Sequence, residues 1–531
     1  MKISLREVAM LDNYEPIFGK NVIETLSEGM YDNPLFMFRE YVQNAADSID
    51  AAEKKGILEN GSGEIVITID SQKRFICFED NGTGICQADV TKMLANIGAS
   101  QKDRKTDKGF RGIGRLGGLG YCKTVRFETS AMGEEIQTTL EWDAHALHEI
   151  LADKDKHIHA GQLIQIITSI SRKSCDKEKH FFRVSLIDIN NNSGELLDSE
   201  EVKKYLAMVA PVPFDYEKFP FIEEIERFLK KNKLPQLHEY QLYVNGDEIR
   251  KGYETPLKIE DGKHVDILGV ECHVITADEK VIGWYWYCIS RFEGALPKKC
   301  WQRCIRLRKA NIQIGEADCL SNHPRRGIPL WKEDRGNNYF LGEIHALDED
   351  LIPNSRRDYF NQDDACRRFE IALTEAFEKL RKLYRDASTL RSETAKIQAA
   401  NQARKEFEAK ERAGEFLNSQ DRENAKNAVE KLEASGKAAQ KKIEKIYDKA
   451  VTGAIGKVAD EYMPEVLETY DKVDKKPFVP KAEPVKGYAE DNIKPATMSV
   501  LKTVFDVLNN VLPPDQSELV REAIIRRFVK K

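Results

Sequence analysis

The sequence predicts an α+β fold, with a sheet-containing N-terminal region, a second mixed region and a helical C-terminal region. Three observations support this class: apolar residues at helical spacing over 19–56, alternating strand patterns after it, and a shift to Ala, Glu, Lys, Gln and Arg beyond residue 385. The 531 residues exceed what one core holds, because single cores stop growing at roughly 250 to 300 residues. We therefore expect two to four domains.

The first region, residues 1–215, alternates helical and strand patterns. Its strands are expected to form one mostly antiparallel sheet with helices on one face, the arrangement of an α/β sandwich. These strand segments are EIVITID, RFICFED, KTVRFETS, QTTLEWD, GQLIQIITSI and FFRVSLIDI.

The second region, residues 216–385, contains the strand patterns YQLYVNGDEI, VIGWYWYCIS and CIRLRKANIQI, and an amphipathic helix closes it. Residues 386–470 predict long charged helices, paired as a hairpin or coiled coil with a break near EASGK; a solvated surface helix without a partner is the alternative. Residues 471–497 suit a linker, and 498–531 predict two short amphipathic helices around Pro513 and Pro514. Their apolar faces need cover from this chain or from a dimer partner.

The composition excludes some classes of protein. A net charge of −6 argues against a generally cationic nucleic-acid-binding surface. With no apolar run of membrane-spanning length and no signal-like start, we expect a cytoplasmic protein, whose ten scattered cysteines stay reduced. Cys300, Cys304, Cys319 and His323 have a spacing that zinc could use; the alternative is two thiols flanking a basic strand and two residues in the loop after it.

The stretch FREYVQNAADSID predicts a helix with a polar row. Glu40, Asn44 and Asp47 stand at i, i+4 and i+7 and therefore share one face, beside apolar residues that border a core. An Asn oxygen suits Mg²⁺ as one ligand among waters and phosphates, and a carboxylate one turn away can orient and deprotonate a water.

Asp80 follows directly after a predicted strand, in CFEDNGTGI. An acid at a strand end can accept a hydrogen bond from an exocyclic amine such as that of adenine. Gly82 and Gly84 allow the backbone to pass close to a flat ligand. A plain Asp-Asn-Gly turn is the alternative.

A glycine-rich segment, KGFRGIGRLGGLGYC, offers backbone N–H groups for phosphate. Gly109, Gly112 and Gly114 fit G-x-x-G-x-G. The segment is not a P-loop, because no G-K-[ST] follows and the polar stretch before it, GASQKDRKTDK, is no buried strand. A closing lid suits it better.

In their order and spacing, these three elements resemble the nucleotide-binding domain of the GHKL superfamily, which gyrase, heat-shock protein 90, histidine kinases and MutL share. The sequence resembles most the heat-shock protein 90 type, as in bacterial HtpG, because residues 19–50 are similar to that family's first helices. NIGASQK resembles the start of its lid, which implies nucleotide contacts for Asn96, Gly98 and Lys102. The resemblance implies a Bergerat-type α/β sandwich.

The resemblance also implies roles. Glu40 would be the general base and Asn44 the Mg²⁺ ligand, while Asp47 and Asp80 would contact the nucleotide, Asp80 at the adenine amine. The remaining implied contacts are those of glycines and one lysine: Gly82 and Gly84 at the base, and Lys102 with the backbone of Gly109, Gly112 and Gly114 at the phosphates.

The loop DEDLIPNSRRDYFNQ resembles the middle-domain loop of heat-shock protein 90, whose arginine reaches the γ-phosphate. Counting from Asn354 selects Arg357, with Arg356 as the runner-up; two surface arginines are the alternative. MutL and gyrase use a lysine on a different second domain. A histidine kinase would need a phosphoacceptor histidine before the Asn44 helix, whereas the first histidine is His145.

The sequence departs from the family at Gly161, which Gln162 follows where Gly-Thr is usual, and no resemblance extends beyond about residue 386. The resemblance implies an ATP-binding, ATP-hydrolysing, chaperone-like clamp that uses Mg²⁺, acts on protein clients and forms a homodimer. The alternatives are an ATP-gated interaction or assembly switch with little turnover, and a DNA-linked clamp as in MutL, which the acidic balance and Arg357 disfavour.

Overall fold

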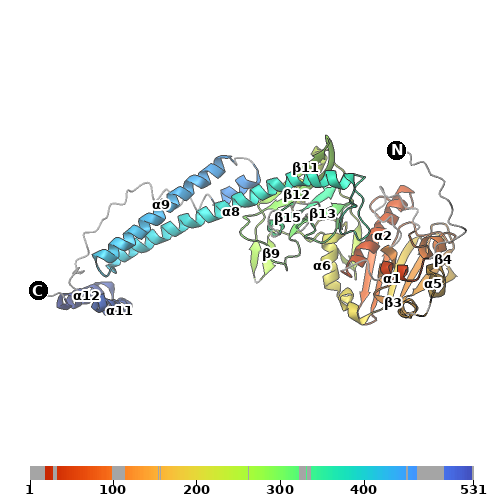
Figure 1. Cartoon of the computed structure of the whole chain (residues 1–531), viewed down its shortest axis with the longest axis horizontal. Coiled ribbons are helices and arrows are strands. Elements are labelled where there is room, and N and C mark those ends of the chain that lie inside the picture. Colours follow the sequence, from red (N-terminus) through yellow and green to blue (C-terminus); the bar gives the residue numbers. More distant parts are fainter. Residues whose placement is uncertain are drawn as a thin grey trace. The chain divides into compact units, whose positions relative to one another are not determined.

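A computed structural model describes most of the chain, and it has the expected α+β fold (Figure 1). The described residues are 18–27, 33–98, 114–153, 155, 157–260, 262–321, 330–331, 336–449, 453–462 and 495–528. The chain divides into two compact units, Met1–Cys288 with Ala295–Glu378 and Ile289–Gly294 with Lys379–Lys531. The first expected region, 1–215, belongs to the first unit, and so does the second, 216–385, except for residues 289–294 and 379–385.

The first sheet of this unit has the strand order β5-β4-β3-β6-β2-β1-β7-β8. Every neighbouring pair is antiparallel except β1 and β7, which run parallel. The strands are β1 (Glu64–Asp70), β2 (Phe75–Asp80), β3 (Cys122–Ser130), β4 (Ile136–Asp143), β5 (Thr168–Ser174), β6 (Phe181–Ile189), β7 (Gln241–Val244) and β8 (Asp247–Glu248).

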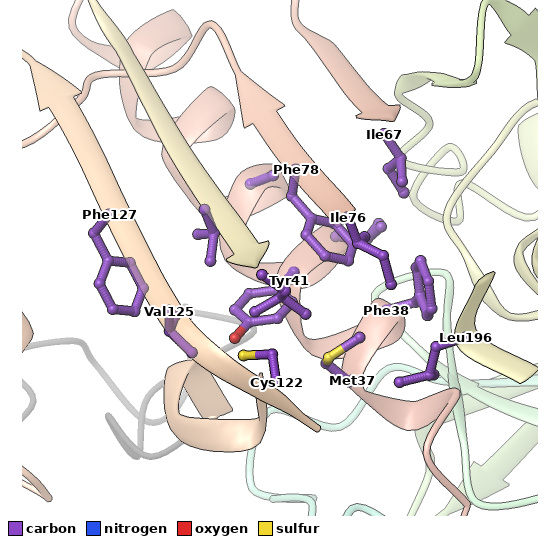
Figure 2. Packing of buried hydrophobic residues seen from close by; sticks show 14 of the residues in the cluster. Met37, Phe38, Tyr41, Ile67, Ile76, Phe78, Cys122, Val125, Phe127 and Leu196 are labelled. Carbon is purple, nitrogen blue, oxygen red and sulfur yellow. The ribbon is translucent and has the colours of Figure 1, made fainter. Parts of the chain in front are cut away.

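One face of this sheet carries the core. Residues of β1 are alternately exposed and buried, as a half-buried strand requires. Apolar side chains of α2 pack on the buried face, and Figure 2 shows Phe38 and Tyr41 against Phe78, with ring centroids 5.2 Å and 4.7 Å from it. The helices of this region are α1 (Asn21–Ser27), α2 (Phe36–Lys54), α3 (Val90–Ala95), α4 (Ala144–Ala152), α5 (Ala160–Ile167) and α6 (Ser199–Val209), with the 3₁₀ turns η1 (Gly114–Gly118) and η2 (Asn191–Leu197).

Two segments of this sheet differ from the expectation. Residues 161–167, expected in a strand, lie in α5, and β5 begins only at Thr168. A short apolar run suits a buried strand and a buried helix turn equally, so the pattern does not separate the two. Strand β7, expected in the second region, instead extends the first sheet beside β1.

The second sheet has the order β11-β12-β15-β13-β14. The predicted strand CIRLRKANIQI is a hairpin: β13 turns at Ala310 and Asn311, whose positive φ angles of 49° and 59° match a tight two-residue turn, and returns as β14. The elements here are α7 (Ile222–Lys231), β9 (Leu257–Glu260), β10 (Lys263–Val265), β11 (Gly269–Ala277), β12 (Lys280–Ile289), β13 (Cys304–Lys309), β14 (Ile312–Ile314), η4 (Gly336–Tyr339) and β15 (Leu341–Ala346).

A buried charge network crosses this second sheet. The Glu343 carboxylate on β15 lies 2.6 Å from Arg308 Nε and 3.8 Å from Lys251 Nζ, and all three side chains are 0% exposed. The hydroxyl of Tyr253 donates to the same carboxylate at 3.1 Å. Burial alone would raise the pKa of Glu343, but the charges of Arg308 and Lys251 outweigh it and hold the pKa well below its usual range.

The same two cations reach the end of α6. Lys251 Nζ donates to the Ala210 carbonyl at 3.1 Å, and Arg308 donates to the Met208 carbonyl. The last carbonyls of a helix lack partners inside it and attract positive charge. The network therefore ties the second sheet to a helix that packs in the core of the first.

The helices α8 (Asp364–Ala413) and α9 (Ser419–Lys449) run side by side as a hairpin (Figure 1). Lys442 Nζ bonds to Glu393 at 3.1 Å across it. The expected break near EASGK is wrong: those residues lie inside α9, and the chain turns at Gly414, whose φ is 66°. A Cβ at Gly436 would lie 3.2 Å from Ala400 Cβ, so the glycine lets the helices approach instead of ending one.

The tail forms two helices as expected, α11 (Pro495–Val511) and α12 (Pro514–Phe528). Leu501, Phe505 and Ile525 form a small core on which Leu417 of the hairpin turn packs. Arg521 donates to the carbonyl of Gly414 at 2.6 Å, so the tail docks on its own chain. Of the linker expected at 471–497, residues 471–494 lie outside the described residues. Residues 495–497 belong to α11, which begins at Pro495. Of the helices in the described ranges, none is long and apolar enough to cross a membrane.

Candidate functional site

The helix α2 carries the polar row. Asn33 lies in the turn before the helix, and its Oδ1 accepts the Leu35 N–H at 3.0 Å, which satisfies a backbone donor next to the helix start. Glu40 and Asp47 are buried, with 7% and 8% exposure, and Asn44 between them is half-buried. The row thus borders the core, as the sequence indicates.

The turn after β2 presses against this helix. The buried Asp80 carboxylate accepts the Gly82 N–H at 3.0 Å. A Cβ on Gly82 would lie 2.1 Å from Ser48 Oγ, and one on Gly84, whose φ is 62°, would lie 1.9 Å from the Ser130 carbonyl oxygen. Neither position has room for a side chain, so only glycine permits this close approach of backbone to α2 and β3.

The end of the glycine-rich segment meets the same helix. A Cβ on Gly114, the first residue of η1, would lie 2.7 Å from Glu40 Oε2. The Tyr41 hydroxyl donates to the Arg115 carbonyl at 3.0 Å. The helix row, the Asp80 turn and Gly114 are therefore gathered around α2. Three further predicted contacts, Lys102, Gly109 and Gly112, lie outside the described residues.

Arg115 joins η1 to the end of α3. Its guanidinium donates to the carbonyls of Leu94, at 3.4 Å, and of Asn96. Burial lowers the pKa of Arg115 to about 10. Asn96 is the exposed residue that ends α3, and Gly98 follows with a φ of 73° and no atom within 4 Å of an added Cβ.

The arginine loop reaches Glu40 from the second region. Pro353 pairs with Phe360, and the turn between them buries Arg357 while Arg356 is exposed. Arg357 Nε lies 3.7 Å from Glu40 Oε1. The neighbouring Arg39 NH2 lies 3.9 Å from the same oxygen. Two buried guanidinium groups therefore face one carboxylate, and of the two arginines in the loop only Arg357 faces it.

Sequence reasoning missed several residues near the turn. His180 Nδ1 donates to the Gly82 carbonyl at 2.8 Å, and Thr129 Oγ1 accepts the Ile85 N–H at 2.8 Å while donating to the Phe181 carbonyl at 2.9 Å. These bonds fix the backbone on the side of the turn away from α2. Only long-range strand pairing brings His180 there, so no local pattern marks it. Gly161, the position where the family usually has Gly-Thr, lies in α5.

The donor set fits Mg²⁺ held mainly by a nucleotide. Within the described residues, the Asn44 side chain makes no hydrogen bond, and no group of three or more His, Cys, Asp or Glu could hold a metal. One amide oxygen is what Mg²⁺ takes from a protein when waters and phosphates complete its shell. The described residues give no support to a zinc site at the cysteines. The Cys304 thiol contacts the Asn338 side chain, and the Cys319 thiol contacts the Ile314 carbonyl. His323 lies outside the described residues.

Comparisons with known proteins agree with this geometry. Residues 37–180 match the family described as "Histidine kinase-, DNA gyrase B-, and HSP90-like ATPase". The chaperone protein HtpG of Alcanivorax borkumensis is 24% identical over 150 residues, covering 25% of this chain and 24% of that protein. HtpG of Shewanella baltica is 26% identical over 181 residues (30% and 27%), and HtpG of Bordetella parapertussis is 25% identical over 222 residues (35% and 34%).

Each match covers about a quarter to a third of the relative's own length. The family match at residues 37–180 includes the helix row, the Asp80 turn and Gly114. The N-terminal region of this chain is therefore similar to the histidine kinase-, DNA gyrase B- and HSP90-like ATPases, and among them to HtpG.

Proposed function

We propose that this protein binds Mg·ATP beside α2, hydrolyses it to ADP and phosphate, and works as a chaperone-like clamp of heat-shock protein 90 type. One observation carries the proposal. Glu40 on α2 and Arg357 in the loop of the second region, distant in the sequence, lie 3.7 Å apart beside Gly114. A carboxylate for water and a cation for phosphate are the two groups that phosphoryl transfer to water needs most.

Each side chain has a task in this proposal. Glu40 orients the attacking water and takes its proton, and Arg357 stabilises negative charge on the γ-phosphate. Asn44 supplies one oxygen for Mg²⁺, which when bound neutralises phosphate charge. Asp80 accepts a hydrogen bond from the adenine amine, and the backbone of Gly82 and Gly84 lies beside the base. Asp47 makes a further polar contact with the nucleotide.

The arrangement also supports a second candidate, an ATP-gated switch with little turnover. Among the described residues, Glu40 Oε1 accepts no hydrogen bond, and its charge is shared between Arg39 and Arg357. Catalysis then requires Arg357 to exchange Glu40 for the γ-phosphate, and the ease of this exchange sets the turnover.

ATP binding and turnover of the wild type, of two variants and of a control variant separate the two candidates. We expect Glu40→Ala to bind ATP but barely hydrolyse it, and Asp80→Asn to lose binding. Glu79→Gln is the matched control, because Glu79 is the adjacent acid on β2 and pairs with Arg183 at 2.9 Å instead of facing α2. Wild-type binding without hydrolysis would sink the enzyme and leave the switch; unchanged binding by Asp80→Asn would sink the site.

The clamp itself needs separate tests. We propose a cytoplasmic homodimer in which a lid closes on ATP and the cycle acts on protein clients. Suppression of aggregation of an unfolded model protein, with and without ATP, tests the chaperone action. The mass of the chain in solution, with and without residues 495–531, tests assembly: a monomer only after truncation places the dimer contact in the tail.

A further inference from the structure

Arg357 has an unfavourable backbone conformation. Its φ is 54°, in the left-handed region, which costs a residue with a side chain roughly 1–2 kcal/mol. It ends a turn in which the Arg357 N–H donates to the Asn354 carbonyl at 3.1 Å, a place where turns of this kind favour glycine. Such strain persists where neighbouring structure enforces it, and it gathers at functional sites.

The enforcing neighbour is Gly315, directly after β14. Its N–H donates to the Arg357 carbonyl at 2.8 Å. Its own φ is 68°, and a Cβ there would lie 2.5 Å from the Asp358 carbonyl oxygen and 2.8 Å from Cys319 Cβ. The conformation disfavours any other residue, and the space leaves no room for a Cβ, so a side chain would push the arginine loop away.

The next residue, Glu316, contacts the segment before α2, which carries Glu40, the partner of Arg357 in the ion pair. The Glu316 carboxylate accepts from Asn33 Nδ2 at 3.3 Å, and Asn33 lies in the turn that leads into α2, the helix that carries Glu40. Two successive residues on the end of β14 therefore contact the loop of Arg357 and the start of α2. The hydrogen-bonded second sheet supplies their rigidity, because β14 pairs with β13 and β13 with β15.

We propose that Gly315 is a positioning residue for Arg357. It holds the loop that contains Arg357 against the end of β14. In this position the Arg357 guanidinium reaches Glu40 and the γ-phosphate. The inference rests on the ATP hydrolysis proposed above. A methyl group on Gly315 displaces the Asp358 carbonyl and carries Arg357 with it, and a displacement of about 1 Å in a catalytic group can cost a hundredfold in rate.

The test compares two alanine substitutions of left-handed glycines. Gly315→Ala should lower kcat by about a hundredfold with ATP affinity unchanged. Gly246→Ala is the matched control: Gly246 has a φ of 89° in the turn between β7 and β8, with no atom within 4 Å of an added Cβ, so it shares the backbone strain without the displacement. The control should lose some Tm and keep its kcat.

A double mutant separates positioning from general damage. In an Arg357→Ala background, Gly315→Ala should cost no further kcat, because the group that it positions is gone. Wild-type kcat in Gly315→Ala, or the same fold-loss in both backgrounds, would overturn the inference. If Gly315→Ala does not fold, Asn354→Ala takes its place, since the Asn354 side chain bonds to Asp358 within the loop.

A readout without ATP keeps this inference separate from the proposed function. Absent wild-type turnover would refute hydrolysis alone. The Tm shifts of Glu40→Gln and Arg357→Ala should be non-additive, because the two side chains form an ion pair. Non-additivity that disappears in the Gly315→Ala background supports the positioning role; non-additivity that persists there refutes it.

Discussion

Replacing Glu343 by Gln should strongly destabilise the second sheet. The substitution keeps the size of the side chain and an oxygen for Tyr253, but it removes the charge that Arg308 and Lys251 share at 2.6 Å and 3.8 Å. With all three side chains 0% exposed, the loss belongs to the range of buried pairs, about 3–5 kcal/mol, because Arg308 is left buried without its counter-charge. Burial and the charge of Arg308 already lower the pKa of Lys251 well below its ordinary value, and the substitution removes the carboxylate that favours its charged form. An exposed pair would lose far less.

Urea unfolding followed by tryptophan fluorescence measures this loss. Trp284 stacks on His345, a neighbour of Glu343, with ring centroids 4.2 Å apart, so its emission reports on the network. Glu200→Gln is the control, because Glu200 pairs with Lys203 in solvent at the start of α6 and should leave the urea midpoint almost unchanged. A loss below about 1 kcal/mol in Glu343→Gln would show that the buried charges are not mutually dependent.

Three further outcomes follow from the structure. Arg357→Ala should lower ATP turnover by about a hundredfold or more, while the exposed Arg356→Ala keeps it; equal losses in a kcat assay would contradict the assignment. Gly84→Ala should abolish ATP binding in calorimetry because its Cβ meets the Ser130 carbonyl, whereas Gly61→Ala, at a glycine of positive φ with open space around it, should bind. The depressed pKa of Glu343 stabilises the fold above the unfolded-state pKa of about 4.3, and this contribution is lost as pH falls through the folded-state pKa. The urea midpoints of wild type and Glu343→Gln should therefore converge below about pH 4, and a constant gap would refute this.

Strand alternation predicts most of the first sheet because one of its faces is exposed. In β1, the pattern of Ile65, Ile67 and Ile69 with polar neighbours is a local property, and the structure repeats it as alternating burial. Residues 161–167 carry no such alternation, and there the prediction of a strand is wrong. The prediction of a helix break near Gly436 is wrong for a related reason. A glycine can end a helix or let two helices pack closely, and only the partner helix decides which of the two occurs.

The candidate site divides in the same way. The row on α2 and the turn at Asp80 are patterns within a few residues, so the sequence predicts both, and the structure brings them together. Gly315 and Glu343 have meaning only through partners far along the chain, and neither stands in a motif. The roles assigned to Lys102, Gly109 and Gly112 stay predictions, since those residues lie outside the described ranges.

The parallel pairing of β1 with β7 affects how the protein emerges from the ribosome. A chain grows at roughly 5–20 residues per second during synthesis. The outer edge of β1 therefore stays unpaired until residues 241–244 have been synthesised. Until then, its N–H and C=O groups offer a template for pairing with other chains. A shortened gene that stops at residue 215 would leave that edge open permanently and favour aggregation of its product. One that continues to residue 250 would include the strand that covers it.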